Sequence, residues 1–243
     1  MKSQLTIAAA VKTSVVPALA TFLLIVPGLG EPGSHFVRNY PALVPIHLSV
    51  TDGHGDITIS AWNKREISVR TSMARPVMIE DRVNGSTISL TVKHPNTERV
   101  DFDISAPADT CLAVKTTMGK IDISGLNGHI DADTVDGDIH LAHLQTPSLD
   151  AKAIHGDIYF DGELKGDGPY SLESMRGDID VSLPDGVSFD LSARALTDSI
   201  NLGGFLLSPG SHQPKFIFGK HDGGGPRLSL TTYDGRIFLH KKK

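Results

Sequence analysis

A short phrase, Gly-x-Ile followed by an apolar residue two positions after the Ile, recurs along this chain of 243 residues. It begins at Gly55, Gly119, Gly128, Gly137, Gly156, Gly177 and Gly235. Self-similarity of this kind indicates a stack of repeated units, because a single unit cannot bury its own apolar face. The repeat constrains the fold more than any other feature of the sequence.

The apolar pairs of the repeat fall into two interleaved series. The first series is Ile121/Ile123, Ile139/Leu141, Ile158/Phe160, Ile179/Val181 and Ile200/Leu202, with steps of 18, 19, 21 and 21 residues. The second series is Ile130/Ala132, Leu149/Ala151, Tyr170/Leu172 and Phe189/Leu191, with steps of 19, 21 and 19 residues. Two series with nearly equal steps predict about two strands in each repeat of 18–21 residues.

Polar residues such as Asp122, His140 and Asp180 separate the two members of most pairs. Strict alternation of apolar and polar residues is typical of a half-buried strand. Gly and Asp at the junctions allow the backbone angles of tight corners. We therefore predict an all-β fold, a stacked β-repeat or β-solenoid. A true coil and two packed sheets both fit the pattern, and its handedness stays open.

The alternation extends upstream to Ile46 and downstream to Leu239 with less regularity. Residues 203–214 and 219–226 are rich in Gly and Pro, and we interpret them as long loops before a terminal cap. No clear linker interrupts the pattern. We expect residues 31–243 to form a single β-repeat domain.

Residues 1–30 have the features of an export signal. Lys2 and Lys12 are the only charged residues among them, an apolar stretch runs from Val15 to Leu29, and small residues follow at Gly28 and Gly30. A second processing site is available at Ala18 and Ala20. The alternative is an uncleaved membrane anchor over residues 13–30. Both readings predict that the rest of the chain lies outside the cytoplasm.

Charge and cysteine content exclude several classes of protein. Without Lys2 and Lys12 the chain has 21 basic and 28 acidic residues, a net charge of −7, which argues against nucleic acid as a partner. The C-terminal lysines 241–243 are too short a run to change this. Cys111 is the only cysteine, so no intramolecular disulfide can form, and its alternating surroundings predict a strand position.

The stretch Gly55-Asp56-Ile57-Thr58-Ile59-Ser60-Ala61-Trp62, followed by Ile67-Ser68-Val69, resembles the opening repeat of the bacterial putative-adhesin, β-strand-repeat family. This family is catalogued as a domain of unknown function, and some members are described as toastrack domains. The resemblance covers about residues 45–240. It implies a stacked all-β fold on proteins of the cell envelope, and it implies no catalytic residues.

The acids of the repeated turn are the first candidates for a ligand site. Asp138, Asp157 and Asp178 occupy equivalent positions and can align as an acidic ladder, which has the oxygen ligands that Ca²⁺ prefers. The calcium-binding pattern Gly-Gly-x-Gly-x-Asp is absent. A structural role for Asp as a turn residue is the alternative, and we predict no metal or cofactor.

Histidines beside turns are a second set of candidates: His54, His129, His140, His143 and His155. His140 and His155 with nearby acids can assemble a metal or acid–base site across neighbouring repeats, but no compact spacing such as His-Glu-x-x-His supports it. Surface histidine on the polar side of a strand is the preferred interpretation. The tripeptide Arg176-Gly177-Asp178 matches an integrin-recognition motif, and we interpret it as a product of the repeat.

Two further motif matches have structural explanations. Gly28-Leu29-Gly30-Glu31-Pro32-Gly33 fits the dinucleotide fingerprint, but it follows no strand and opens no helix. Asn84-Gly85-Ser86 fits a glycosylation acceptor, but Asn-Gly predicts a hairpin turn. No phosphate-binding loop, nucleophile elbow or Cys-x-x-Cys pair is present.

We therefore predict a non-enzymatic, exported envelope protein that presents a polar, acidic surface to a surface glycan or an envelope protein. A sensory scaffold in an envelope-stress pathway is a variant of the same class. The alternative is a polysaccharide lyase or hydrolase on a β-helix, for which only the loops after residue 202 leave room. The sequence does not define an oligomeric state.

Overall fold

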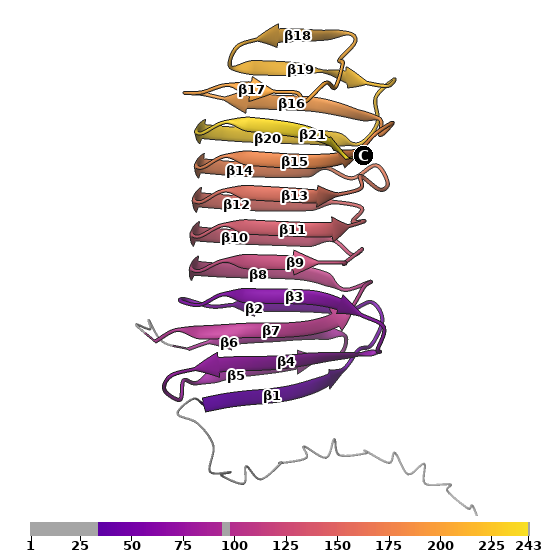
Figure 1. The fold of residues 1–243 in the computed structure, drawn as a ribbon. Helices are drawn as coiled ribbons and strands as arrows, with labels where there is room; N and C mark the ends of the chain where they lie inside the picture. Colours follow the sequence, from indigo (N-terminus) through magenta and orange to yellow (C-terminus); the bar gives the residue numbers. More distant parts are fainter. Residues whose placement is uncertain (1–33, 94–97, 243) are drawn as a thin grey trace, which may run out of the picture. The chain divides into compact units, whose positions relative to one another are not determined.

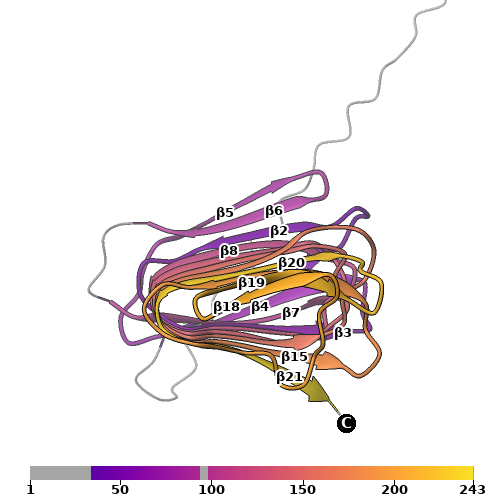
Figure 2. The same cartoon turned by 90° about the horizontal axis from the view of Figure 1, so that it is seen from above.

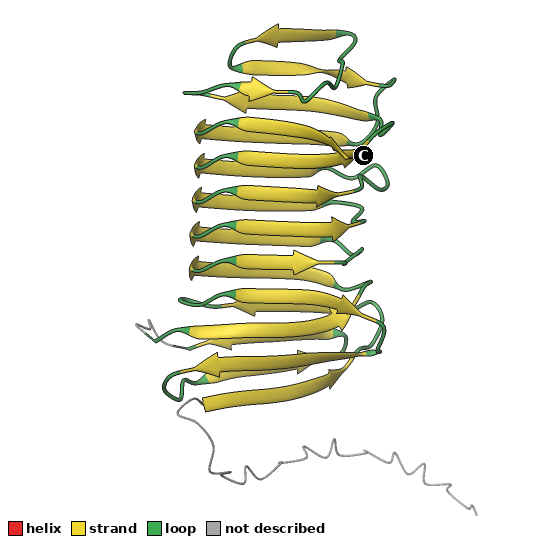
Figure 3. Ribbon diagram, viewed as in Figure 1, coloured by secondary structure: helices red, strands yellow, loops and turns green. Residues whose placement is uncertain are grey.

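The computed structural model describes residues 34–93 and 98–242. In this part of the chain the strands lie one above another in a stack (Figure 1), and the view along the stack shows two sheets facing each other (Figure 2). All regular secondary structure in the described residues is β-strand (Figure 3). The predicted all-β stacked repeat is confirmed, as coils whose strands form two packed sheets. The expected export signal at residues 1–30 lies outside the described residues.

Within residues 34–93 and 98–242, sheet A has ten strands and sheet B has eleven. In stacking order, sheet A contains β1 (Ser34–Pro41), β4 (Glu66–Met73), β7 (Val100–Pro107), β3 (Ile57–Trp62), β9 (Ile121–Ser124), β11 (Ile139–Leu144), β13 (Ile158–Gly162), β15 (Ile179–Pro184), β21 (Ile237–Lys242) and β17 (Ile200–Asn201). In the opposite direction, sheet B contains β18 (Gly210–Gln213), β19 (Phe216–His221), β16 (Phe189–Ala195), β20 (Arg227–Asp234), β14 (Tyr170–Arg176), β12 (Leu149–His155), β10 (Ile130–Asp136), β8 (Cys111–Met118), β2 (His47–Thr51), β6 (Thr87–Val92) and β5 (Ile79–Asn84).

Each coil of the stack contains one strand of sheet B followed by one strand of sheet A. The first predicted series of apolar pairs forms strands of sheet A, and the second series forms strands of sheet B. Neighbouring strands from β6 to β16 and from β7 to β17 are parallel and in register, as in the pairing of Ile139 with Ile158. The prediction of two strands in each repeat is therefore correct.

The coils do not all follow one another in sequence order. The last coil, β20–β21, is inserted between β14–β15 and β16–β17, so that Ile237 pairs with both Ile179 and Ile200. The expected terminal cap is therefore wrong for these strands. The cap is formed instead by β18 and β19, which pair antiparallel beyond β16 within stretches expected to be loops. Every coil has the same alternation of apolar and polar residues. This alternation predicts that a segment is a strand, but it does not determine where the strand lies in the stack.

The other end of the stack is closed by antiparallel strands and a partly buried polar contact. Strand β1 pairs with β4, and β5 pairs with β6 through a two-residue turn at Gly85 and Ser86. This confirms the hairpin predicted there. Arg38 of β1 forms an ion pair with Asp81 of β5, and the Tyr40 hydroxyl donates to the same carboxylate over 2.9 Å. A charge on the inner side of an edge strand opposes pairing with further strands.

The core is a set of apolar ladders between the two sheets. In one ladder Ile57, Ile121, Ile139, Ile158, Ile179 and Ile237 lie in register with no exposed surface. Burial of each such side chain contributes about 1.5–3 kcal/mol to folding. Because every coil adds to the same ladder, no coil is stable without its neighbours.

Glycines form a second ladder where the chain passes from sheet B to sheet A. Gly156 has a φ of +154°, and a Cβ on it would lie 2.0 Å from the carbonyl oxygen of Gly137. The same contact recurs from coil to coil at Gly119, Gly137, Gly177 and Gly235. Only glycine fits between backbones that approach this closely, which explains the invariant residue of the repeated phrase.

Within residues 34–93 and 98–242 no helix has the length and apolarity needed to cross a membrane.

Candidate functional site

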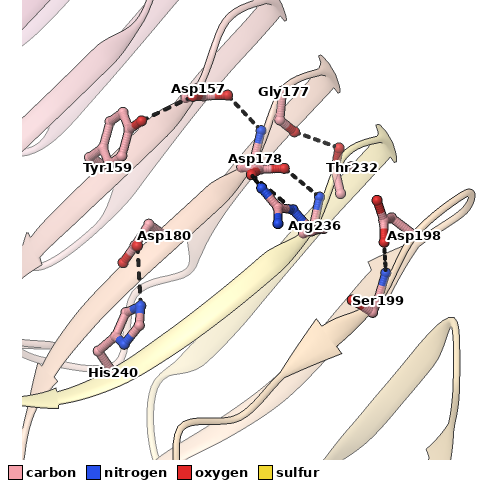
Figure 4. Close-up of polar contacts among 10 residues, drawn as sticks. All are labelled: Asp157, Tyr159, Gly177, Asp178, Asp180, Asp198, Ser199, Thr232, Arg236 and His240. Atoms are coloured by element: carbon pink, nitrogen blue, oxygen red, sulfur yellow. Dashed lines mark hydrogen bonds and ion pairs between the residues drawn. The ribbon is translucent and has the colours of Figure 1, made fainter.

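The acids of the repeated turn are aligned as the sequence predicts, and they hold the coils together (Figure 4). Asp138 Oδ1 accepts a hydrogen bond of 2.8 Å from the backbone N–H of Asp157, and Asp157 Oδ1 accepts one of 2.7 Å from that of Asp178. The series ends where Asp178 Oδ1 accepts from the N–H of Arg236 over 2.7 Å. Each carboxylate thus binds the next coil.

The second oxygen of these carboxylates is also engaged in two of the three turns. Asp157 Oδ2 accepts from the hydroxyl of Tyr159, and Asp178 Oδ2 accepts from Nη2 of Arg236 over 2.7 Å. Burial alone would raise the pKa of Asp178, but the hydrogen bonds from Arg236 outweigh it and hold the pKa below its ordinary value. The described residues contain no group of three or more acids, histidines or cysteines placed to bind a metal.

The outer face of sheet A beside this turn carries aromatic rings and a carboxylate in register. We define the ring face as His140, Tyr159, Asp180, Phe238 and His240. Strand pairing places the first four in one row across β11, β13, β15 and β21. His240 Nε2 donates to Asp180 Oδ2 over 3.1 Å, as drawn in Figure 4, so the fifth member contacts the row.

Tyr159 is fixed within the ring face by contacts on two sides. Its hydroxyl donates to Asp157 Oδ2 over 3.0 Å, and its ring meets that of His140 edge to face, with centroids 4.6 Å apart. Burial, followed by the hydrogen bond to Asp157, raises the pKa of Tyr159 to about 12. The phenol therefore remains a neutral donor, although 39% of the residue is exposed.

A second feature is a row of exposed apolar side chains at the end of the sheet B strands. We define the apolar ridge as Val135 (39% exposed), Ile154 (40%), Met175 (48%), Leu196 (39%) and Tyr233 (42%). Pairing of the flanking residues places them side by side in successive coils of the stack. Sequence analysis missed this row. The signal was present, because a large apolar residue stands two positions before the glycine of the repeat in several coils.

The outer face of sheet B is charged and internally paired. Lys115 binds Asp133 over 2.7 Å, and Lys152 binds Asp150 over 2.6 Å. Burial, followed by the charge of Asp133, raises the pKa of Asp131, which lies beside them. This face has charges of both signs and offers no single complementary charge to a partner.

The candidate histidines lie apart. His155 Nε2 is 3.2 Å from Nη1 of Arg176 at the turn, whereas His140 lies on the sheet A face with Nδ1 3.7 Å from Asp122. His129 Nδ1 is 2.7 Å from the hydroxyl of Ser148 on the sheet B side. His54 forms an isolated bridge with Met118, and its Nδ1 is buried. His143 is exposed near the end of β11, where its φ is +55°.

The remaining motif residues have contacts that explain them by their role in the fold. Asp178 of the Arg176-Gly177-Asp178 tripeptide is held by Arg236, and Gly177 lies in the glycine ladder. Cys111 is half-buried on β8, as its alternating surroundings predict. The dinucleotide-like match at residues 28–33 lies outside the described residues.

A depression with polar groups in its lining lies at the loop edge of the stack. This depression of about 460 Å³ is lined by His143, Glu163, Asp185 and Lys242, among others. Its acids have lysine partners, since Glu163 lies 2.6 Å from Lys165 and Asp185 lies 3.2 Å from Lys241. After residue 202, where an enzyme cleft was considered, the chain forms the β18–β19 hairpin instead.

Two of the comparisons with known proteins, the family model and the first structure below, agree with this architecture. The family model described as Toastrack DUF4097 matches residues 99–239. A crystal structure titled as a putative cell adhesion protein from Clostridium sporogenes is 16% identical, with a TM-score of 0.57, and covers 86% of this chain and 100% of its own. A putative adhesin from Bacteroides fragilis is 14% identical, with a TM-score of 0.43, and covers 86% of this chain and 97% of its own. No curated protein matches.

Proposed function

The chain belongs to the Toastrack DUF4097 family, and from that premise we propose that it is an exported, non-enzymatic envelope scaffold that presents its faces to a partner in adhesion. The observation that carries the proposal is the arrangement of the turn acids. Oδ1 of each of these acids, Asp138, Asp157 and Asp178, accepts a hydrogen bond from the backbone of the next coil, which is a structural use. What remains for interaction is the outer surface of the stack.

Three features support presentation of a surface over catalysis. The outer surface of sheet A is built from regular, in-register strands, and the acids of the loop-edge depression have lysine partners. The structural neighbour from Clostridium sporogenes is described as a putative cell adhesion protein. The charge of the sequence after residue 30, −7, argues against nucleic acid as a partner.

Export is part of the proposal and comes from the sequence of residues 1–30. The apolar stretch after Lys12 either is removed as a signal or anchors the stack to a membrane. In both cases the scaffold works outside the cytoplasm, in the periplasm, at the cell surface or after secretion. A sensory scaffold in the envelope belongs to the same class of protein. Its partner binding would be followed by an envelope-stress response in place of attachment.

Deletion of the gene in the organism that carries it tests this function. We expect the deletion strain to lose attachment to a surface or to other cells, and the full-length gene to restore it. Unchanged attachment with an altered envelope-stress response would replace adhesion by sensing. Purified protein that releases new reducing ends or unsaturated products from envelope polysaccharides would overturn the non-enzymatic assignment.

A further inference from the structure

The ring face is the part of the surface with a defined ligand chemistry. Its rings belong to His140, Tyr159, Phe238 and His240, and the carboxylate of Asp180 stands between Tyr159 and Phe238 in the same row. The ladder hydrogen bonds of the sheet do not need these side chains. A chain of the same fold needs only a polar residue at each of these positions.

The ring face is ordered before any ligand arrives. Tyr159 is fixed by Asp157 and His140, and Phe238 lies between the guanidinium of Arg236, 5.1 Å from the ring centroid, and the stacked ring of His240 at 6.1 Å. Side chains that are already held lose little conformational freedom on binding. These contacts give the surface the preorganisation of a binding site.

Asp180 supplies hydrogen-bond acceptors in the middle of the row. A carboxylate has about four acceptor positions, and within the described residues its one side-chain partner is His240. The side chain keeps 33% of its surface exposed. A ligand that lies over Asp180 can therefore donate hydroxyl hydrogen bonds to it, and charge-assisted bonds of this kind are the stronger ones.

Together these groups require a ligand that offers apolar faces and hydroxyl donors in alternation. Pyranose rings have this chemistry, with a C–H face that packs on an aromatic ring and hydroxyls around the rim. Tyr159 and Phe238 lie on strands separated by β15, so their backbones are about 9–10 Å apart. That separation suits a chain of sugars that crosses the strands along the stack.

We propose that the ring face binds a linear, non-anionic polysaccharide that runs across strands β11, β13, β15 and β21. The proposal rests on the proposed adhesive function and names its partner. Asp122 and Asp178 are paired with Lys120 and Arg236, whereas Asp157 and Asp180 have no lysine or arginine partner among the described residues, so an anionic polymer meets repulsion at these two acids. A peptide strand would need an unpaired sheet edge, whereas the ring face lies inside the sheet.

Binding of the full-length protein to soluble hexamers of N-acetylglucosamine and of glucose, measured by calorimetry, tests the proposal. Polygalacturonate is the anionic comparison. We expect saturable binding to at least one hexamer and none to polygalacturonate. We also expect a loss of affinity of about ten-fold for Tyr159→Ala and again for Phe238→Ala, and a smaller loss for Asp180→Asn.

Tyr233→Ala is the matched control, because Tyr233 is a similarly exposed tyrosine on the apolar ridge. It should bind as the wild type does, and circular dichroism should show every variant folded. Equal affinity of Tyr159→Ala and wild type, or no binding of either hexamer, overturns the proposal. Expression of Tyr159→Ala/Phe238→Ala in the deletion strain separates the two claims. Restored attachment without sugar binding would refute the ring face alone, whereas wild-type protein that restores no attachment refutes the adhesive function.

Discussion

The backbone N–H of Asp178 donates a hydrogen bond to Oδ1 of Asp157 over 2.7 Å, from one coil of the stack to the coil before it. This contact explains why an acid recurs after the glycine of the repeat. Asp157→Asn keeps an Oδ1 acceptor and should melt within a few degrees of wild type. Asp157→Ala removes the acceptor and should cost about 1 kcal/mol. Urea denaturation of both variants measures the difference, and equal stability would remove the structural role of the acid.

Burial, and not side-chain type, should decide the effect of a charge within one coil. Ile158 has no exposed surface, whereas Ile154, in the adjoining strand of the same coil, is 40% exposed on the apolar ridge. Ile158→Asp places an unpaired carboxylate in the core and should unfold the stack, since its cost approaches the whole stability of a typical domain. Ile154→Asp should melt close to wild type. Equal melting of the two variants would contradict the repeat architecture.

The glycine ladder predicts a backbone clash from the smallest possible substitution. A methyl group at Gly156 would lie 2.0 Å from the carbonyl oxygen of Gly137, in a conformation with φ at +154°. Gly156→Ala should therefore cost about 1–3 kcal/mol. Gly53→Ala is the control, because nothing lies within 4 Å of a Cβ there. Thermal unfolding checks the pair, and a tolerated Gly156→Ala would mean that the coils are less close than described.

Asp52 is a buried acid directly after strand β2, and its burial predicts a pH effect. The residue is 4% exposed, and its Oδ2 has no hydrogen-bond partner among the described residues. Burial raises its pKa above the ordinary value of 3.8, so the folded state binds this proton more tightly than the unfolded state. The stabilising effect of protonation is present below that ordinary value and is lost as the pH rises through the raised pKa.

Asp52→Asn keeps the shape and the Oδ1 acceptor that Gly53 N–H uses over 2.7 Å. At neutral pH the variant should be more stable than wild type by about 1 kcal/mol, and the gap should close on acidification. Urea denaturation of both proteins at several pH values from 3 to 7 measures this gap. The contributions of the other carboxylates cancel in the difference, because both proteins contain them. A gap that is constant with pH would show that Asp52 is not the titrating group.

The insertion of the last coil predicts that the C-terminal region is as essential as the middle of the chain. Leu230 and Leu239 have no exposed surface and lie between coils that precede them in sequence. Leu230→Asp should therefore unfold the stack as Ile158→Asp does. Limited proteolysis should then cut coils on both sides of the inserted one. Local loss of residues 227–242, with the rest intact, would place this coil at the end of the stack.

The sequence predicts those parts of the structure that local alternation determines. The ladder through Ile139, Ile158 and Ile179 follows from period two and a nearly constant step, because each residue contacts its equivalent in the next coil. The place of Ile237 between Ile179 and Ile200 does not follow, because its coil has the same alternation as all the others. Partner choice among equivalent strands depends on long-range packing, which no local pattern records.

The candidate site follows the same division. Alignment of Asp138, Asp157 and Asp178 is predicted by their equivalent positions, but their use as acceptors for the next coil depends on the closeness of the backbones. The row of His140, Tyr159, Asp180 and Phe238 could not be predicted from the sequence, because Phe238 joins it through the inserted coil.

Function outside the cytoplasm is the central claim about this protein, and protease shaving of intact cells tests it most directly. Cells are treated with protease before and after permeabilisation of the envelope, then fractionated, and the stack is detected with an antibody. We predict that the protein is absent from the cytosol and is removed either from intact cells, as a surface adhesin, or only after permeabilisation, as an internal envelope scaffold. Full-length protein in the cytosol, with residues 1–30 still attached, would contradict the account.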